Sequence, residues 1–287
     1  MKKQISNKLI HSFIAAMLLM SCSTCKNSSG NPADPDTGPV FQKSDKGDAI
    51  RLVSYNVGVF SKYDKGNYET IANMMKELDA DVVFMSELDS CTTRTEGIFQ
   101  IKRFSTLMGW EYSYGKAMPY QGGFYGEGLS CKEKILCKYA VPLPQAGGAE
   151  PRVMAVAELE NYILASTHLD HVSDEAQLKQ VEVINKTMMD AYQNCGKPVF
   201  IGGDFNALPS SATIQAMKEH WNIITVQVAT FPSDSPSKCI DYIMQLNNGV
   251  KCDRMRSAVP TSFKSGSVTR ASDHLPIYVD AKLPENK

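Results

Sequence analysis

The stretch from Lys197 to Ser211 constrains the fold of this chain more than any other segment. Residues 198–201 form a short apolar run entered through a proline, which is typical of a strand buried on both faces. Two glycines follow, and they allow a tight turn and the close approach of another group. The loop therefore presents Asp204 and Asn206 at the carboxyl end of a strand, the edge where layered folds bind ligands. The same Gly, Asp and Asn residues are also common in ordinary polar turns.

Alternation of strands and helices along the chain predicts an α/β protein. Apolar periodicity predicts helices over residues 66–78, 98–108, 174–192 and 212–219, the third with an apolar stripe of Leu178, Val181, Ile184 and Met188. Strands are predicted over residues 49–57, 81–88, 110–117, 152–159, 162–169, 240–246, 254–259 and 277–283, around Ile223, and after the glycine-rich turn at 121–130. No internal repeat or linker interrupts residues 49–283, which indicates one domain.

Polar side chains recur where these strands end. Taken singly, each has an ordinary explanation, such as a turn cap or a histidine satisfied in the core. The ordinary explanation does not account for the recurrence of a carboxylate, a carboxamide or an imidazole at one strand end after another. We therefore expect these residues to converge on one cleft: Asn56, Glu87, His168, Asp204, Asn206, Asp241, Asp273 and His274.

The first 21 residues carry three lysines, an apolar run over residues 9–20 and the sequence Leu19-Met20-Ser21-Cys22. This segment resembles a bacterial lipoprotein signal peptide, which implies cleavage before Cys22 and lipidation of that cysteine. The alternatives are a plain secretory signal or a short anchor. The expected organisation is a signal peptide at 1–21, a flexible tether at 22–48 and a folded domain at 49–287. The mature protein would then be anchored by lipid in the bacterial cell envelope, outside the cytoplasm.

Charge and cysteine usage narrow the function classes. Removal of residues 1–21 would take away three lysines and no acid, so the formal net charge would change from −1 to −4. An acidic chain of this kind disfavours duplex nucleic acid as a partner, because backbone binding needs a basic face. Cys22 aside, seven cysteines remain at irregular spacing, which fits neither a disulfide framework nor a zinc site.

Seven short motifs occur in the order found in the endonuclease/exonuclease/phosphatase superfamily of metal-dependent phosphoesterases, which the chain therefore resembles. They are Ser54-Tyr55-Asn56, Ser86-Glu87, Tyr125-Gly126 with Leu129-Ser130, Thr167-His168-Leu169, Gly203-Asp204-Phe205-Asn206, Ile240-Asp241-Tyr242-Ile243 and Ser272-Asp273-His274-Leu275-Pro276. They cover residues 50 to about 283. The resemblance implies a four-layer α/β sandwich of two packed mixed sheets flanked by helices.

The resemblance also implies roles for the residues that match the motifs. Glu87 would be the main ligand of Mg²⁺ or Mn²⁺, with Asn56 and Asp273 close to the ion. Asp204 would orient and deprotonate the attacking water, and Asn206 would hold a phosphoryl oxygen. His274, oriented by Asp241, would stabilise charge at phosphorus, and His168 would lie near the leaving group. The implied reaction is in-line attack of water on a phosphoester.

The chain departs from the family pattern at Glu127, where small or apolar residues are usual, so anion binding there is in doubt. Lys116 and Arg152 are the basic residues expected nearest the substrate phosphate, with salt-bridged surface positions as the alternative. A hydrolase that acts on a small molecule or a lipid head group is favoured over a nuclease, because the mature chain is acidic and membrane-tethered. We expect the protein to be a monomer. A nuclease and a non-catalytic binding lipoprotein of the same fold are the alternative functions.

Overall fold

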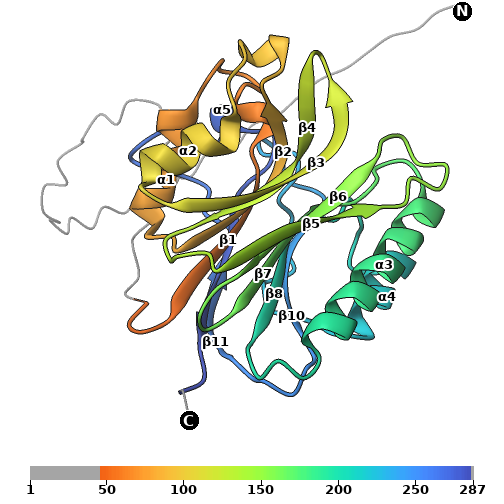
Figure 1. Cartoon of the computed structure of the whole chain (residues 1–287). Helices are drawn as coiled ribbons and strands as arrows, with labels where there is room; N and C mark the ends of the chain where they lie inside the picture. The colour runs from red at the N-terminus through yellow and green to blue at the C-terminus, as the bar shows by residue number, and fades with distance from the viewer. Residues whose placement is uncertain (1–45, 286–287) are drawn as a thin grey trace, which may run out of the picture. The chain divides into compact units, whose positions relative to one another are not determined.

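The computed structural model describes residues 46–285, which form two six-stranded sheets with helices on their outer sides (Figure 1). The first sheet contains β1 (Ile50–Asn56), β2 (Val82–Ser90), β3 (Glu111–Tyr120), β4 (Gly123–Cys131), β11 (Asp253–Ala258) and β12 (Ile277–Lys282). The second contains β5 (Cys137–Leu143), β6 (Arg152–Glu158), β7 (Ile163–His168), β8 (Val199–Asp204), β9 (Trp221–Ile223) and β10 (Asp241–Leu246). The helices are α1 (Tyr68–Leu78), α2 (Gln100–Met108), α3 (Asp174–Tyr192), α4 (Ala212–Lys218) and α5 (Val268–Ala271), with short 3-10 turns η1 (Gly58–Phe60) and η2 (Thr93–Thr95).

Both sheets are mixed, and they share one plan. The first has the order β11-β12-β1-β2-β4-β3 and the second the order β5-β6-β7-β8-β10-β9. Each holds one parallel pair, β1 with β2 and β7 with β8, among antiparallel neighbours. The carboxyl ends of a parallel pair lie at the same edge, and an antiparallel neighbour brings its amino end there. Asp241 at the start of β10, for example, lies opposite Asp204 at the end of β8.

Alternating side chains on the central strands build three apolar layers. On β1, Leu52 faces the space between the sheets, whereas Val53 packs with the outer cluster that contains α1 and α2. On β8, Phe200 faces the other sheet and Ile201 joins the cluster under α3 and α4. The result is the four-layer α/β sandwich that the sequence predicts (Figure 1).

The paired glycines at the end of β8 serve the close approaches that their sequence suggests. A Cβ atom on Gly202 would come within 2.3 Å of the Phe84 ring, which belongs to the other sheet. Gly203 adopts φ +150°, and a Cβ there would meet the Thr167 carbonyl oxygen at 1.8 Å. Glycine at these two positions lets the sheets and strands meet directly under the polar loop.

Most predicted elements are present, but the short helix α5 and the 3-10 turns η1 and η2 are not predicted from the sequence. The edge strand β5 is not predicted, and Leu178 of the expected apolar stripe on α3 is 38% exposed, while Val181, Ile184 and Met188 are buried. Residues 46–285 contain no helix long and apolar enough to cross a membrane. The predicted signal peptide and Cys22 lie outside the described residues, as does nearly all of the predicted tether.

Candidate active site

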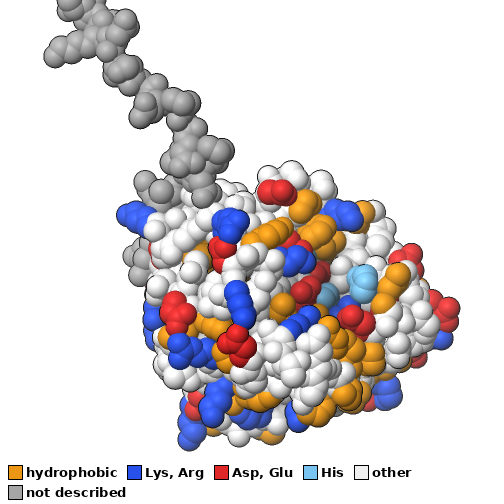
Figure 2. Space-filling view, turned by 90° about the horizontal axis from the view of Figure 1, so that it is seen from above, with side chains coloured by type: hydrophobic (Ala, Val, Ile, Leu, Met, Phe, Trp, Pro, Cys, Tyr) orange, Lys and Arg blue, Asp and Glu red, His pale blue; other side chains and the backbone are white. Residues whose placement is uncertain are grey.

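The eight strand-end residues predicted to converge do lie together, at the end of the molecule where both parallel pairs finish. Figure 2 shows acidic and histidine side chains gathered in a hollow of this face. Six of the eight line a pocket of about 370 Å³, and Asn56 and Asp241 are buried next to its lining residues. Each sheet supplies part of the site: Asn56, Glu87, Asp273 and His274 come from β1, β2 and the loop before β12, and the others come from β7, β8 and β10.

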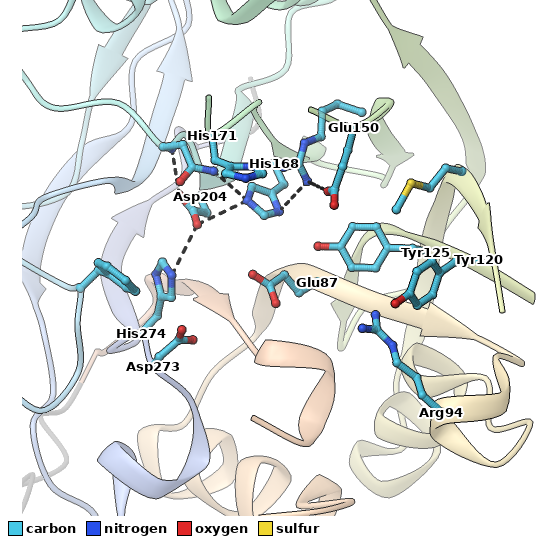
Figure 3. A pocket seen from close by; sticks show the side chains of 14 residues that line it. Glu87, Arg94, Tyr120, Tyr125, Glu150, His168, His171, Asp204, Asp273 and His274 are labelled. Atoms are coloured by element: carbon cyan, nitrogen blue, oxygen red, sulfur yellow. Dashed lines mark hydrogen bonds and ion pairs between the residues drawn. The ribbon is translucent and has the colours of Figure 1, made fainter. Parts of the chain in front are cut away.

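A buried aspartate orients His274. The Nδ1 atom of His274 lies 2.9 Å from Oδ2 of Asp241, which also accepts a 2.5 Å hydrogen bond from the Thr230 hydroxyl. The other ring nitrogen, Nε2, faces Oδ2 of Asp204 at 3.5 Å. The Phe231 ring packs against the imidazole with centroids 4.8 Å apart. The ring is thereby fixed with one nitrogen turned toward the pocket (Figure 3).

The pKa values of this histidine and of Asp204 are both raised, for different reasons. Burial alone would lower the pKa of His274, but the carboxylates of Asp241 and Asp204 outweigh it and raise the pKa to about 10. Burial raises the pKa of Asp204 to about 7, although the charge of His274 opposes the rise. Near neutral pH the site therefore holds a cationic imidazole beside a carboxylate that can take up a proton.

Asp204, Asp241 and His274 also form a buried group in which each residue offers one ligand atom within 4.8 Å of the others. His274 already uses Nδ1 to bind Asp241, and its raised pKa favours the protonated ring, which cannot bind a metal. We therefore interpret this group as a hydrogen-bonded chain, with the oxygen atoms around Glu87 and Asp273 better suited to a hard divalent cation.

Glu87 occupies an unusual backbone position. It has φ +61° and lies in an irregular stretch of the β2–β4 pairing between Met85 and Leu88. Such a bulge re-aims a side chain from a sheet edge, and here it places the carboxylate in the middle of the pocket (Figure 3). The Asn56 amide nitrogen donates to Oε1 of Glu87 at 3.0 Å and to Oδ2 of Asp204 at 3.1 Å. The amide oxygen of Asn56 accepts from the Gly58 N–H, so Asn56 in this orientation positions carboxylates and turns its own oxygen away from them.

Asp273 is adjacent to a cation supplied by the chain itself. Its Oδ2 lies 2.6 Å from the Lys62 ammonium group, and its Oδ1 is buried without a hydrogen-bond partner in the described residues. Burial would lower the pKa of Lys62, but the hydrogen bond to Asp273 and the charges of Asp273 and Glu87 raise it. A lysine that contacts Asp273 and is stabilised by the charge of Glu87 indicates that this position favours positive charge. The oxygen ligands, the unpartnered Oδ1 and this ammonium group fit a site for a hard divalent ion.

His168 is neutral and lies between Arg152 and Asn206. Burial lowers the pKa of His168 well below its usual value, and the nearby Arg152 lowers it further. Nη1 of Arg152, which can only donate, lies 3.2 Å from Nδ1 of His168. Nε2 faces the Asn206 amide at 2.9 Å and Oδ2 of Asp204 at 3.5 Å. His168 and Asn206 thus share the pocket wall next to Asp204.

Glu127, whose place in the site is in doubt from sequence, is fully buried. Its Oε2 accepts the Glu87 backbone N–H at 3.1 Å, and it therefore supports the bulge that carries Glu87. Burial raises the pKa of Glu127 to about 8, against the opposing charge of Arg152. The carboxyl group is mostly protonated at neutral pH, so it adds little negative charge near an anionic ligand.

The two predicted basic residues have different positions. Arg152 is 2% exposed, lines the pocket and lies 3.4 Å from Glu150 and 3.9 Å from Glu127. Lys116 does not line the pocket, because its ammonium group lies on the Phe124 ring, 4.0 Å from the centroid. Sequence reasoning missed Lys62 and Arg94, which lie in loops after strand ends and carry no signal beyond their charge.

Small hydroxyl residues connect the parts of the site. The Ser86 hydroxyl accepts the Asp204 backbone N–H at 3.2 Å and thereby joins the two sheets below the pocket. The Ser272 hydroxyl donates to the Asn56 carbonyl oxygen at 2.6 Å and accepts the His274 N–H at 3.2 Å. Both serines belong to motifs identified in the sequence, where the signal for them is their position beside an acidic or histidine residue.

Comparison with known proteins places the chain among phosphoester-processing folds. The model of the endonuclease/exonuclease/phosphatase family matches residues 53–274. A family member from Bacteroides vulgatus has 17% sequence identity and a TM-score of 0.66, and the match covers 82% of this chain and 99% of that chain. A mannosyl-6-phosphatase from Bacteroides thetaiotaomicron has 18% identity and a TM-score of 0.66, covering 81% and 99%.

More distant enzymes share the fold as well. The 2′,3′-cyclic phosphatase ANGEL2 has 15% identity and a TM-score of 0.62, covering 81% of this chain and 94% of that chain. No curated protein matches the chain in sequence. At these identities the structural likeness concerns the fold alone, whereas the family model covers most of the chain, including all eight strand-end residues of the site.

Proposed function

The chain belongs to the endonuclease/exonuclease/phosphatase family, whose members hydrolyse phosphoesters, and from this premise we propose that it is a Mg²⁺-dependent hydrolase of a small phosphorylated molecule. The observation that carries the proposal is the pairing of Asp204 and His274 in one pocket with the Glu87 and Asp273 carboxylates. This arrangement supplies a proton acceptor, a cation and oxygen ligands around a space that a phosphate can enter.

Mg²⁺, or Mn²⁺ in its place, would be held mainly by Glu87, with Asp273 beside it. Both residues offer carboxylate oxygens, the ligand type that hard ions prefer, and Lys62 supports the preference for positive charge here. A bound ion would neutralise negative charge on the phosphate and on the leaving oxygen. Asn56 would hold the Glu87 carboxylate through its amide nitrogen.

Asp204 is the proposed general base. Its pKa of about 7 suits proton uptake from water at neutral pH, and Asn56 and the Asn206 N–H fix the carboxylate through hydrogen bonds to its two oxygens. The protonated His274, oriented by Asp241, would hold a phosphoryl oxygen by a charge-assisted hydrogen bond. Asn206 would donate to another oxygen, and His168 would lie near the leaving group.

The charge of the pocket favours a small substrate over nucleic acid. Four carboxylates line it, namely Glu87, Glu150, Asp204 and Asp273, and a polyanionic backbone would meet this charge as it approached. A relative of the same fold is a mannosyl-6-phosphatase, which supports a small phosphorylated substrate as well. We further propose that a lipid on Cys22 anchors the enzyme in the cell envelope, outside the cytoplasm.

A panel of phosphoesters tests the activity. The purified domain should hydrolyse p-nitrophenyl phosphate or a small natural monoester with Mg²⁺ or Mn²⁺, and EDTA should abolish the activity. Plasmid DNA tests for nuclease activity, sphingomyelin tests for hydrolysis of a lipid head group, and bis-p-nitrophenyl phosphate tests for phosphodiesterase activity. Glu87→Gln should require far more Mg²⁺ for half-maximal activity while the fold is retained. Activity that resists EDTA, or a Glu87→Gln variant with wild-type Mg²⁺ dependence, would refute the proposal, and an inert protein would favour the binding-protein alternative.

A further inference from the structure

The pocket extends well beyond the residues assigned to the chemistry. Its volume of about 370 Å³ lies in the range of pockets that enclose a small organic ligand, roughly 300–1,000 Å³, and not a phosphate alone. On the side away from His274 it is bounded by Arg94, Tyr120, Tyr125 and Glu150, which we call the outer subsite (Figure 3). Glu87 lies between this subsite and Asp273.

Arg94 is a fixed part of the outer subsite. Its Nε and Nη2 atoms donate to the two oxygens of Asp89 at 2.6 and 2.8 Å, and Asp89 is fully buried. The guanidinium carbon lies 4.5 Å from the centroid of the Tyr120 ring and 5.9 Å from that of Tyr125. A guanidinium held by a bidentate pair and by ring stacking loses little entropy when it binds a further group. Its remaining N–H groups can therefore act as pre-positioned donors.

Arg94 is a poor site for a second anion. Asp89 already neutralises its charge, so the guanidinium offers hydrogen-bond donors with little net positive field. The other cations of the pocket are also in use: Arg152 contacts Glu127 and Glu150, and His274 contacts Asp204 and Asp241. Four carboxylates are among the lining residues, and one divalent ion with one phosphate dianion adds no net charge, so a second phosphate would not be compensated.

The chemistry of the outer subsite instead suits a neutral group rich in hydroxyls. Glu150 provides a carboxylate acceptor and is held by Arg152 at 3.4 Å, and Arg94 provides donors across the pocket. Tyr120 and Tyr125 add phenol groups and flat ring surfaces against which the C–H face of a ring can pack. Donors, acceptors and aromatic faces together recognise vicinal hydroxyls on a rigid ring.

We propose that the outer subsite binds the leaving group of the substrate, and that this leaving group is an uncharged polyol ring of the size of one monosaccharide or cyclitol. This inference rests on the proposed function. The substrate is then the phosphomonoester of such a ring. Hydrolysis breaks the phosphorus–oxygen bond, adds the elements of water, and releases phosphate and the neutral polyol.

The test compares substrates that differ only in the leaving group. Glucose 6-phosphate and myo-inositol 1-phosphate carry a polyol ring, glycerol 3-phosphate has hydroxyls without a ring, and adenosine 5′-monophosphate adds a base. In the wild type we expect kcat/KM for one of the ring substrates to exceed that for glycerol 3-phosphate by about tenfold or more. Glu150→Gln and Tyr120→Leu should each lower kcat/KM for that ring substrate about tenfold and lower the glycerol 3-phosphate value by a clearly smaller factor.

Matched controls are Glu160→Gln and Tyr63→Leu, which make the same substitutions outside the pocket. Glu150→Gln and Tyr120→Leu leave the ion pair between Arg94 and the buried Asp89 intact. A variant of Arg94 would leave Asp89 without this partner and could lose activity through misfolding. Equal losses on ring and glycerol substrates, no loss at all, or a loss confined to adenosine 5′-monophosphate would overturn the inference and leave the proposed function standing. A wild-type protein that hydrolyses none of these esters, nor those of the earlier panel, would overturn both.

Discussion

Replacement of Asp241 by asparagine should lower the pKa of His274 by two to three units. The carboxylate lies 2.9 Å from Nδ1 of His274, and both groups are buried. At an effective dielectric constant of about 20, opposite charges about 4 Å apart attract by roughly 4 kcal/mol, which corresponds to about three pKa units. Asp204 remains in the variant and retains part of the effect. A pKa that is about 10 in the wild type should therefore fall to about 7–8.

The pH–rate profile at saturating Mg²⁺ measures this change. The alkaline limb should move to lower pH in Asp241→Asn, whereas Asp204→Asn should slow the reaction without a comparable shift. Asp234→Asn is the matched control, because Asp234 is an exposed aspartate before the same strand. An alkaline limb that stays in place in Asp241→Asn would show that the two residues do not act as a pair.

Thermal unfolding provides a second measurement that is independent of turnover. A histidine whose folded pKa is raised stabilises the protein fully below its unfolded value of about 6.5, and this contribution is lost as the pH rises through about 10. Asp241→Asn should therefore destabilise the fold most near pH 6 and progressively less toward pH 10. A loss of stability that is constant with pH would indicate only a missing buried hydrogen bond.

Three further variants have expected outcomes that can be measured. Asp204→Asn should lower kcat by roughly 10²–10⁴-fold, and a near-normal kcat would exclude Asp204 as the base. At pH values above 7 the variant should also have a higher melting temperature than the wild type, because its fold no longer buries a charged carboxylate. Glu127→Gln should match wild-type stability near pH 5 and exceed it near pH 9, because the wild type loses stability as the pH rises from about 4.5 toward 8. Parallel curves of stability against pH would show that the Glu127 carboxyl is not buried in its protonated form. Lys62→Met should bind Mg²⁺ several-fold more tightly than the wild type in isothermal titration calorimetry, because the substitution removes a cation from Asp273. Binding equal to or weaker than that of the wild type would show that Lys62 does not compete with the ion.

Much of the fold and the core of the site can be predicted from the sequence, because both depend on local patterns. An apolar run that ends in glycine and a carboxylate defines a strand and its edge, as at Gly203-Asp204. The predicted helix at residues 174–192 agrees with α3 because its apolar spacing and the Ser173 cap are both local. The convergence of Asn56 and Glu87 follows from the parallel pairing of β1 and β2, and His274 joins them because β12, antiparallel to β1, begins at the same edge.

The rest could not be predicted because it depends on contacts between distant segments. Lys62 acquires its position only when the loop after β1 meets Asp273, and Arg94 only when it stacks on Tyr120. The edge strand β5 contains a proline and half-exposed apolar residues, so its pattern is weak. The protonation of Glu127 follows from burial between two sheets, which no local pattern reveals.

The direct contact between Gly202 and Phe84 acts as a spacer for the chemistry several residues away. Glu87 follows Phe84 on one sheet and Asp204 follows Gly202 on the other, so the distance between the proposed ion ligand and the proposed general base depends on how closely these two strands stack. One added methyl group at Gly202 would act as a wedge, since a Cβ there would lie 2.3 Å from the ring. We therefore expect a substitution at Gly202, outside the pocket, to shift the site residues of one sheet relative to those of the other, and to lower activity even where the fold is retained.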